Sequence, residues 1–153
     1  MTLPSHSATD LVIDTATKAD KKTIKRFYKT HGFAASFMGY DSCYIIKQND
    51  DEIIAAIIVS QLVKGNQQAL LHGLYVSCKY RNEGLATKLL EHCIIKHKIL
   101  VCFANNNLQE LYQKVGFSML QEKEVEQHLN TSLITRFNHY QQNQPFLRAF
   151  IQR

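Results

Sequence analysis

The sequence predicts an α/β protein built on a mixed, mostly antiparallel β-sheet with helices on both faces. Three observations support this. Apolar runs of strand length follow one another over residues 42–76, the apolar period becomes helical at Gly84, and strands and helices alternate from residue 69 onward. Strands joined by short turns favour an antiparallel meander, whereas strand–helix–strand units place helices against a sheet.

The size and composition fit one folded domain. The chain has 153 residues, 45% of them hydrophobic and 20% charged, which is ordinary globular usage. We expect a flexible N-terminus over residues 1–10 and a single domain over residues 11–153. The longest apolar run, Ile53–Val59, is much shorter than the roughly 20 residues of a membrane span.

Several cellular contexts can be set aside from the sequence. The N-terminus has no secretory-signal pattern. The four cysteines show no Cys-x-x-Cys spacing and lie in apolar segments, which favours buried free thiols over disulfides or a metal framework. We therefore expect a cytoplasmic protein that neither binds a metal nor associates with a membrane.

The first half of the chain predicts a strand, a helix and then a meander. An opening strand over Leu11–Asp14 precedes a helix that is capped by Thr17 and ends at His31-Gly32. Residues 33–41 show no clean period, so we expect a loop there, and a turn at residues 49–51. The expected strands of the meander are Ser42–Gln48, Ile53–Val63 and Ala69–Val76.

The second half alternates between helices and strands. A helix from Leu85 to about Lys98 and a strand over Ile99–Phe103 precede a second helix, opened by Asn107 and ended by Gly116. The remaining expected elements are a strand over Phe117–Leu120, an amphipathic helix and a closing strand over Phe146–Ile151. The amphipathic helix shows apolar residues at helical spacing, with a cap at Asn130 or Thr131; these residues are Val125, Leu129, Leu133, Phe137 and Tyr140.

Positive charge is concentrated near the N-terminus. Six of the 18 Lys and Arg residues fall within residues 18–29, and the chain has a net charge of +5. On a helix such a run is usually a solvated face, although it could also attract an acidic substrate or RNA. No aromatic-rich RNA-reading motif accompanies the run, which favours the solvated face.

The segment from Val76 to Thr87 joins a predicted strand to a predicted helix. Small residues at Gly84 and Ala86 let a ligand approach the backbone closely. The unpaired first amides of a helix, backed by its dipole, bind phosphates, and Arg81 adds a forked donor. The alternative is a plain strand–helix turn with Gly for geometry. The segment fits neither the P-loop nor the dinucleotide fingerprint.

Two signatures in this region resemble those of a known family. Arg81, Gly84 and Ala86 match the pattern [Gln/Arg]-x-x-Gly-x-[Gly/Ala], and the segment Asn107–Phe117 is similar to the pattern of Asn, Tyr and Gly-Phe that follows it. Over about residues 69–120 the chain thus resembles the GNAT superfamily of N-acetyltransferases. The resemblance implies a GNAT-type acyl-CoA N-acyltransferase fold and acetyl-CoA as the acyl donor.

The resemblance also implies which residues bind the coenzyme. These are the strand residues Leu74, Tyr75 and Val76, the loop and helix residues Arg81, Asn82, Glu83, Gly84, Leu85, Ala86 and Thr87, and Asn107. Asn82 and Glu83 depart from the family, which often has Gly and a basic or polar residue there. An inward-pointing Glu83 would be unfavourable near a pyrophosphate.

Two residues are candidates for proton transfer. Tyr112 matches the tyrosine that protonates the departing sulfur in many members of the family; the alternative is that it only packs on its helix. His72 could accept the proton of the amine, directly or through water, or be an ordinary strand side chain. Asp41, Tyr40 and Tyr44 are weaker candidates for contact with the acceptor.

The predicted function is acetyl transfer from acetyl-CoA to a primary amine on a small molecule or peptide, by a monomer or homodimer. One alternative is a non-catalytic regulatory module that binds acyl-CoA, against which Tyr112 counts, since binding alone needs no acid. Another is a toxin-like acetyltransferase acting on aminoacyl-tRNA, which the basic run would suit.

Overall fold

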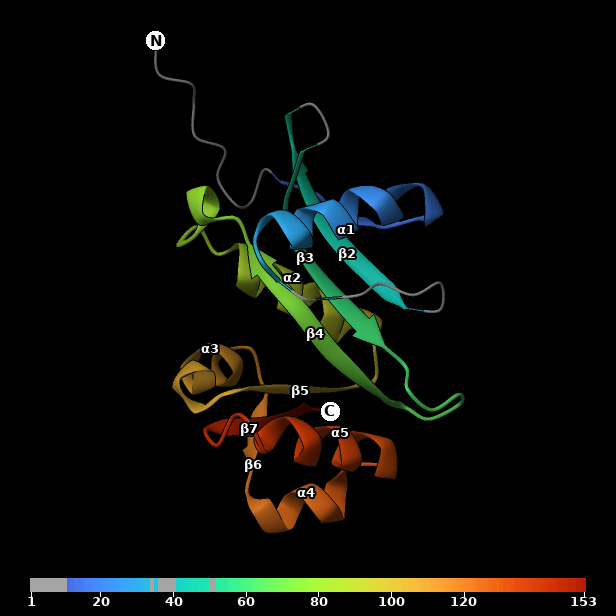
Figure 1. Ribbon diagram of the computed structural model, residues 1–153, viewed down its shortest axis with the longest axis vertical. Coiled ribbons are helices and arrows are strands. Elements are labelled where there is room, and N and C mark those ends of the chain that lie inside the picture. Colours follow the sequence, from blue (N-terminus) through green and yellow to red (C-terminus); the bar gives the residue numbers. More distant parts are fainter. Residues whose placement is uncertain (1–10, 34, 36–40, 50–51) are drawn as a thin grey trace. The chain divides into compact units, whose positions relative to one another are not determined.

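The computed structural model describes residues 11–33, 35, 41–49 and 52–153. Figure 1 shows the helices and strands of these residues. The strands form a seven-stranded sheet with neighbours in the order β1-β2-β3-β4-β5-β7-β6. The predicted mixed sheet with flanking helices is therefore confirmed. The chain divides into two compact units, the first comprising residues up to 58 together with 73–90, and the second residues 59–72 together with 91–153.

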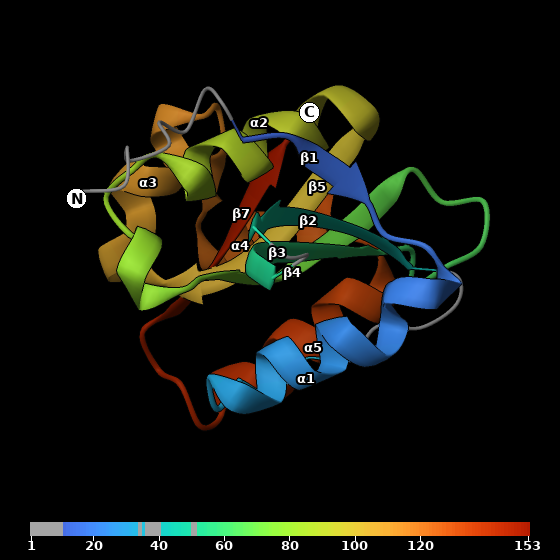
Figure 2. The ribbon, with the colours of Figure 1, turned by 90° about the horizontal axis from the view of Figure 1, so that it is seen from above.

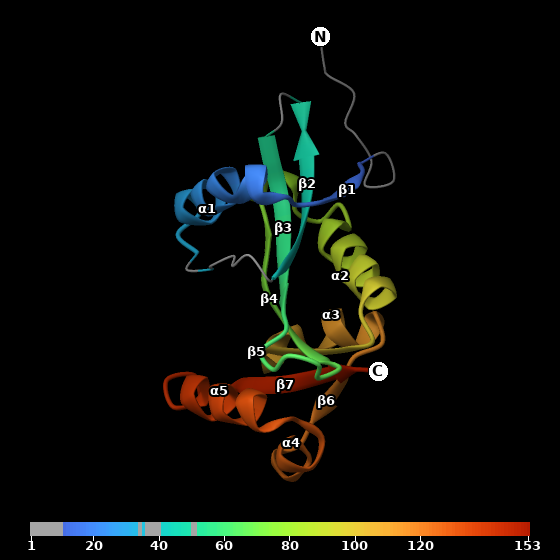
Figure 3. The same ribbon diagram turned by 90° about the vertical axis from the view of Figure 1, so that its right-hand side faces the viewer.

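The first unit holds the N-terminal elements. They are β1 (Ile13–Thr15), the 3-10 turn Lys18–Asp20, α1 (Lys21–Thr30), β2 (Ser42–Gln48) and most of β3 (Glu52–Ser60). β1 pairs antiparallel with β2, Ile13 opposite Ile46. Helix α1 lies along one face of β2 and β3, and the first half of α2 (Leu85–Lys96) lies along the other (Figure 3).

Thr17 caps the 3-10 turn Lys18–Asp20 and not α1 itself, whose N-cap position is Asp20. The Thr17 amide donates to the Asp20 carboxylate at 2.8 Å, and Lys47 Nζ lies 3.3 Å from the same side chain. The bond from Thr17, followed by the contact with Lys47, lowers the pKa of Asp20. Ile24, Phe27 and Tyr28 are buried against β2 and β3, as their helical spacing predicts.

Strand β4 (Gln68–Val76) contains an irregularity that the sequence does not reveal. Gly73 has φ +66°, and the Tyr28 hydroxyl donates to its carbonyl at 2.5 Å. A Cβ at Gly73 would stand 3.0 Å from that hydroxyl oxygen. A left-handed Gly inside a strand is typical of a bulge or of close backbone approach. Here it allows a buried phenol from α1 to reach the strand.

The second unit is about as large as the first. Its further elements are β5 (Ile99–Asn105), the 3-10 turn Asn106–Leu108, α3 (Gln109–Lys114), β6 (Ser118–Leu120), α4 (Glu122–His128), α5 (Thr131–Gln141) and β7 (Leu147–Gln152). Residues 68–71 of β4 run parallel to residues 99–102 of β5, and β7 runs antiparallel to β5 and β6. In Figure 2, β5 and β7 lie between α3 and α5.

Successive side chains of a strand point to opposite faces of the sheet. The apolar side chains of the second unit are therefore divided between the two faces of its strands. On one face a core cluster joins Leu129, Leu133 and Phe137 to Val101 and Ala149. On the other face the ring of Tyr112 stacks on Phe150, with centroids 5.2 Å apart. The helices therefore cover both faces of these strands, as predicted.

The amphipathic segment after residue 120 forms two helices, not the single predicted one. Leu129 has ψ 149°, which ends α4, and Asn130 caps α5 by accepting from the Leu133 amide at 2.9 Å. The Gln68 side chain forms hydrogen bonds with two backbone groups at the break between α4 and α5. Its amide nitrogen donates to the His128 carbonyl at 2.5 Å, and its oxygen accepts from the Asn130 amide at 2.8 Å.

Smaller differences also appear. β3 ends at Ser60, not Val63, and β5 runs on to Asn105. Cys78 is exposed because it lies in a 3-10 turn (Cys78–Tyr80), so the prediction of four buried thiols is wrong there, while the other three are buried and all four are free. Residues 1–10 and most of 33–41 and 49–51 lie outside the described residues. No helix of the described chain has the length and apolarity to span a membrane.

Candidate functional site

The predicted phosphate loop has an unusual backbone. It runs from the end of β4 through the turn Cys78–Tyr80 to α2, and residues 81–84 are exposed. Asn82 has φ 63° and Gly84 φ 80°, both in the left-handed region. Asn is among the few residues that tolerate this region, which explains how Asn82 can occupy a position where the resembling family often has Gly.

The start of α2 leaves backbone donors available. The first helical hydrogen bond of α2 runs from the Lys88 amide to the Gly84 carbonyl at 3.0 Å. The amides of Leu85, Ala86 and Thr87 precede that bond and have no acceptor one turn earlier in the helix. A Cβ built at Gly84 meets nothing within 4 Å, so the space beside this residue is open. The arrangement fits an anion such as a pyrophosphate.

The Arg81 side chain folds back onto the end of β4. Its Nε donates to the Val76 carbonyl at 3.1 Å and its Nη2 to the Tyr75 hydroxyl at 3.0 Å. The Ser77 amide in turn donates to the Ile54 carbonyl of β3 at 2.8 Å. These bonds tie the loop to two strands and use donors of Arg81 that were expected to face phosphate.

Tyr75 lies in an aromatic cluster of the first unit. Its ring centroid is 4.9 Å from that of His31, 5.7 Å from Phe33 and 5.9 Å from Phe27. Leu74, Tyr75 and Val76 are all half-buried. The cluster holds the end of β4, from which the loop departs, against the helix α1.

Tyr112 lies in α3 of the second unit and is only 6% exposed. Burial raises the pKa of its phenol, and a hydrogen bond with the Cys102 thiol raises it further. The ring also contacts Phe117 edge-on, with centroids 5.6 Å apart. A phenol with a raised pKa stays protonated at neutral pH, which suits a proton donor. The pairing of Tyr112 with a sulfur atom was not predicted.

Asn105, not Asn107, caps the turn that precedes α3. Its side chain accepts from the Asn107 amide at 3.0 Å. The Asn107 amide is therefore used inside the cap, while its side chain is exposed. Residues 105–107 are all Asn, so the sequence offers three equivalent caps and does not distinguish among them.

His72 is half-buried in β4 and has a partner that was not predicted. Its Nε2 lies 2.7 Å from the hydroxyl oxygen of Ser60, whose side chain is 5% exposed. Ser60 ends β3 and carries no motif that marks it. Of the weaker acceptor candidates, Tyr44 is buried, Asp41 is half-buried, and Tyr40 lies outside the described residues.

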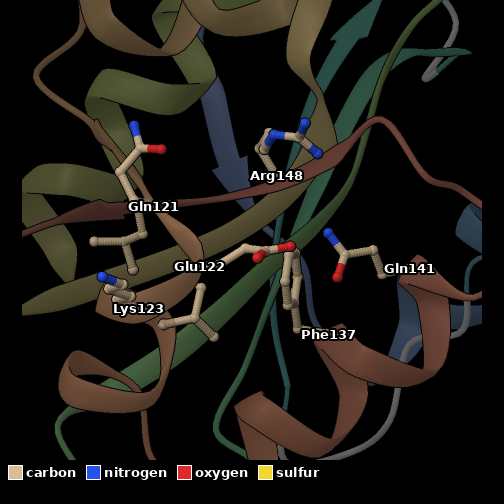
Figure 4. Close-up of a pocket in the computed structure, with 8 residues that line it drawn as sticks. Gln121, Glu122, Lys123, Phe137, Gln141 and Arg148 are labelled. Atoms are coloured by element: carbon tan, nitrogen blue, oxygen red, sulfur yellow. The ribbon is translucent and has the colours of Figure 1, made fainter.

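A cavity of about 400 Å³ opens in the second unit (Figure 4). Apolar side chains of Leu120, Val125 and Phe137 line part of it, and Gln121, Glu122, Lys123, Gln141 and Arg148 line the rest. Arg148 Nη1 donates to the carbonyls of Pro145 and Leu147. None of the predicted coenzyme or catalytic residues lines this cavity.

The sequence matches a known protein family. A family model described as the Acetyltransferase (GNAT) domain matches residues 39–119, more than half of the chain. The chain belongs to the GNAT acetyltransferase family. The family predicted from the two signatures is thus confirmed, and with it the enzyme class of an acetyltransferase. No curated protein matches the chain.

Solved structures share the fold of this GNAT acetyltransferase. N-acetylglutamate synthase from Neisseria gonorrhoeae, complexed with coenzyme A and N-acetyl-glutamate, has TM-score 0.66 and 19% identity over 94% of this chain. The GNAT chain spans only 35% of that enzyme. A GNAT-family acetyltransferase from Staphylococcus aureus Mu50 has TM-score 0.63 and 13% identity, covering 93% of this chain and 98% of its own.

A third structure carries the acyl donor. The GNAT-family acetyltransferase from Elizabethkingia anophelis with acetyl-CoA bound has TM-score 0.56 and 17% identity, covering 93% of this chain and 97% of its own. At these identities the similarity establishes the fold of this GNAT acetyltransferase. Among its described residues, no cluster of three or more His, Cys, Asp or Glu side chains could hold a metal ion.

Proposed function

We propose that the protein transfers the acetyl group of acetyl-CoA to a primary amine. The observation that carries the proposal is the backbone of residues 81–87, where the left-handed Gly84 has open space beside it and precedes the first amides of α2, which have no acceptor one turn earlier in the helix. A site of this kind binds a diphosphate without any particular side chain. Membership of the GNAT acetyltransferase family supports the coenzyme as the ligand.

Within this proposal Arg81 positions the loop. Its bonds to Val76 and Tyr75 keep the turn against β4, so that the amides of Leu85, Ala86 and Thr87 provide the directed contacts with the pyrophosphate. Asn82 and Glu83 are exposed on the same loop, and Leu74 to Val76 offer the strand backbone that the family resemblance assigns to the pantetheine arm. Asn107 is assigned to the coenzyme by that resemblance alone.

The proposed transfer moves an acetyl group from sulfur to nitrogen, with one proton passing to the sulfur and one leaving the nitrogen. The neutral amine nitrogen forms a bond to the thioester carbonyl carbon, the carbon–sulfur bond breaks, and the thiolate takes the proton of the Tyr112 phenol. His72 accepts the proton that the amine nitrogen loses, directly or through water. His72 then releases its proton to solvent and Tyr112 regains one from solvent, so no net proton is taken up. The raised pKa of Tyr112 keeps the phenol protonated until the thiolate forms.

Relatives of known structure support a small amine as the acceptor. The Neisseria enzyme is an N-acetylglutamate synthase, and a spermidine N-acetyltransferase from Vibrio cholerae has TM-score 0.58 and 8% identity over 74% of this chain. Both names describe amine acetylation on a small molecule. Release of free thiol with a panel of amines, polyamines, peptides and charged tRNA would identify the acceptor class.

Binding of the donor should raise thermal stability. Acetyl-CoA at about 100 times its dissociation constant is expected to stabilise the folded protein by roughly 2.7 kcal/mol, because only the folded state binds it. The measurement is a melting curve at increasing acetyl-CoA concentration. Adenosine serves as the control, since it lacks the pyrophosphate and should shift the curve little. A melting temperature that stays constant as acetyl-CoA is added would contradict the proposal.

His72→Ala should remove the acidic limb of the pH profile of kcat/KM. A His base is inactive when protonated, so activity of the wild-type enzyme should fall as pH drops below the pKa of His72. Profiles of wild type, His72→Ala and Ser60→Ala would be compared. We expect Ser60→Ala to shift the limb and His72→Ala to abolish it. An identical limb in His72→Ala would show that another group accepts the proton.

A further inference from the structure

Positive charge is concentrated on α1 and on the 3-10 turn that precedes it. Residues 18–29 hold six basic residues and a single acid, giving this segment +5, which equals the net charge of the whole chain. The other residues carry 12 basic and 12 acidic side chains and are neutral in sum. The basic residues are Lys18, Lys21, Lys22, Lys25, Arg26 and Lys29, and all six are exposed.

Helical geometry gathers these charges on the outward side of α1. At about 100° per residue, the basic residues from Lys21 to Lys29 span an arc of roughly 140°. Ile24, Phe27 and Tyr28 lie on the opposite side and are buried in the core of the first unit. The one acid, Asp20, is bound to the Thr17 amide and to Lys47, so its charge is compensated locally. The arc is therefore uniformly positive.

We propose that this basic face of α1 docks the phosphate backbone of a nucleic acid duplex. Lysine ammonium groups bind phosphates as point charges, and their association releases counterions. No aromatic or apolar side chain of α1 is exposed between them to contact bases. The surface therefore recognises charge along a backbone and not a base sequence.

Two other partners fit the face less well. Cores of protein interfaces are enriched in aromatic residues and depleted in Lys, whereas this arc offers four Lys and one Arg. A helix that lies in a membrane surface needs a free apolar face. The apolar face of α1 is already packed against β2 and β3. A phosphate backbone is the partner that needs charge alone.

The test is binding of labelled duplex RNA and duplex DNA of random sequence, measured by fluorescence anisotropy without coenzyme. For wild type we expect Kd of about 10⁻⁶–10⁻⁴ M near physiological salt, rising with salt at a logarithmic slope of about 4. The variant K21Q/K22Q/K25Q should lower that slope by about 2–3. The measurements with the two duplexes show whether RNA, DNA or both are bound.

Matched variants separate position from total charge. K64Q/K98Q/K123Q removes three exposed lysines from other elements and should retain the wild-type slope, and K21R/K22R/K25R should bind as wild type. Thermal melts check that each variant is folded. The proposal is overturned if neither duplex binds at low salt, or if both glutamine variants bind alike. Stronger binding to phosphatidylserine vesicles or to polyglutamate would equally overturn it, in favour of a membrane or an acidic protein.

Discussion

Gly84→Asp is expected to abolish binding of acetyl-CoA while the protein remains folded. The added carboxylate would extend into the open space beside Gly84, at the start of α2, where the pyrophosphate is proposed to bind. Repulsion between the two anions and the bulk of the side chain act together. We expect a loss of at least about 100-fold in affinity, equivalent to some 2.7 kcal/mol. Isothermal titration with acetyl-CoA measures it.

Gly65→Asp provides the matched control for backbone strain. Gly65 has φ +82°, and a Cβ there meets nothing within 4 Å, as at Gly84. Both substitutions should therefore cost a similar 1–2 kcal/mol or so of folding free energy. Only Gly84→Asp should lose coenzyme binding. Equal affinity of Gly84→Asp and wild type would mean that the pyrophosphate binds elsewhere.

Tyr112→Phe is expected to lower kcat by roughly 10²–10⁴-fold, with little change in coenzyme affinity. Such a loss is typical for removal of a general acid. The substitution keeps the ring that stacks on Phe150 and removes only the hydroxyl. Single-turnover thiol release, together with titration of acetyl-CoA, separates chemistry from binding.

The hydroxyl of Tyr112 also forms a hydrogen bond with the Cys102 thiol. A structural role of this hydroxyl must therefore be distinguished from proton donation. Cys102→Ala removes the partner and leaves the phenol, and we expect it to retain most of the wild-type kcat. Tyr140→Phe, a change at an exposed tyrosine, should have no effect. If Cys102→Ala slows the reaction as much as Tyr112→Phe, the loss reflects packing. An unchanged kcat in Tyr112→Phe would mean that water or the substrate supplies the proton.

Elements encoded by local sequence were predicted well. The strand Ser42–Gln48 was placed residue for residue, because turn residues bound an apolar run on both sides. The loop before α2 was recognised because the spacing of Arg81, Gly84 and Ala86 is itself a sequence motif of the family. The family match confirms the assignment of the fold. The roles of the individual site residues remain predictions.

Features that depend on distant contacts were missed. Gly73 is visible in the sequence, but the reason for it is Tyr28, 45 residues earlier in the chain. Ser60 contacts His72 only because β3 and β4 are folded. The capping residue among Asn105 to Asn107 depends on where β5 ends, which apolar periodicity leaves open by a few residues. Local patterns carry no information on such pairings.

The Gln68 contact limits which residues can replace it as the sequence diverges. Its side chain donates to the His128 carbonyl and accepts from the Asn130 amide at once. Glu in its ionised form can only accept, Lys can only donate, and Asn is shorter by one methylene. Relatives that keep the break between α4 and α5 should therefore keep Gln at this position. Relatives with one continuous helix there have no such constraint, so residue 68 and the helix break are expected to change together.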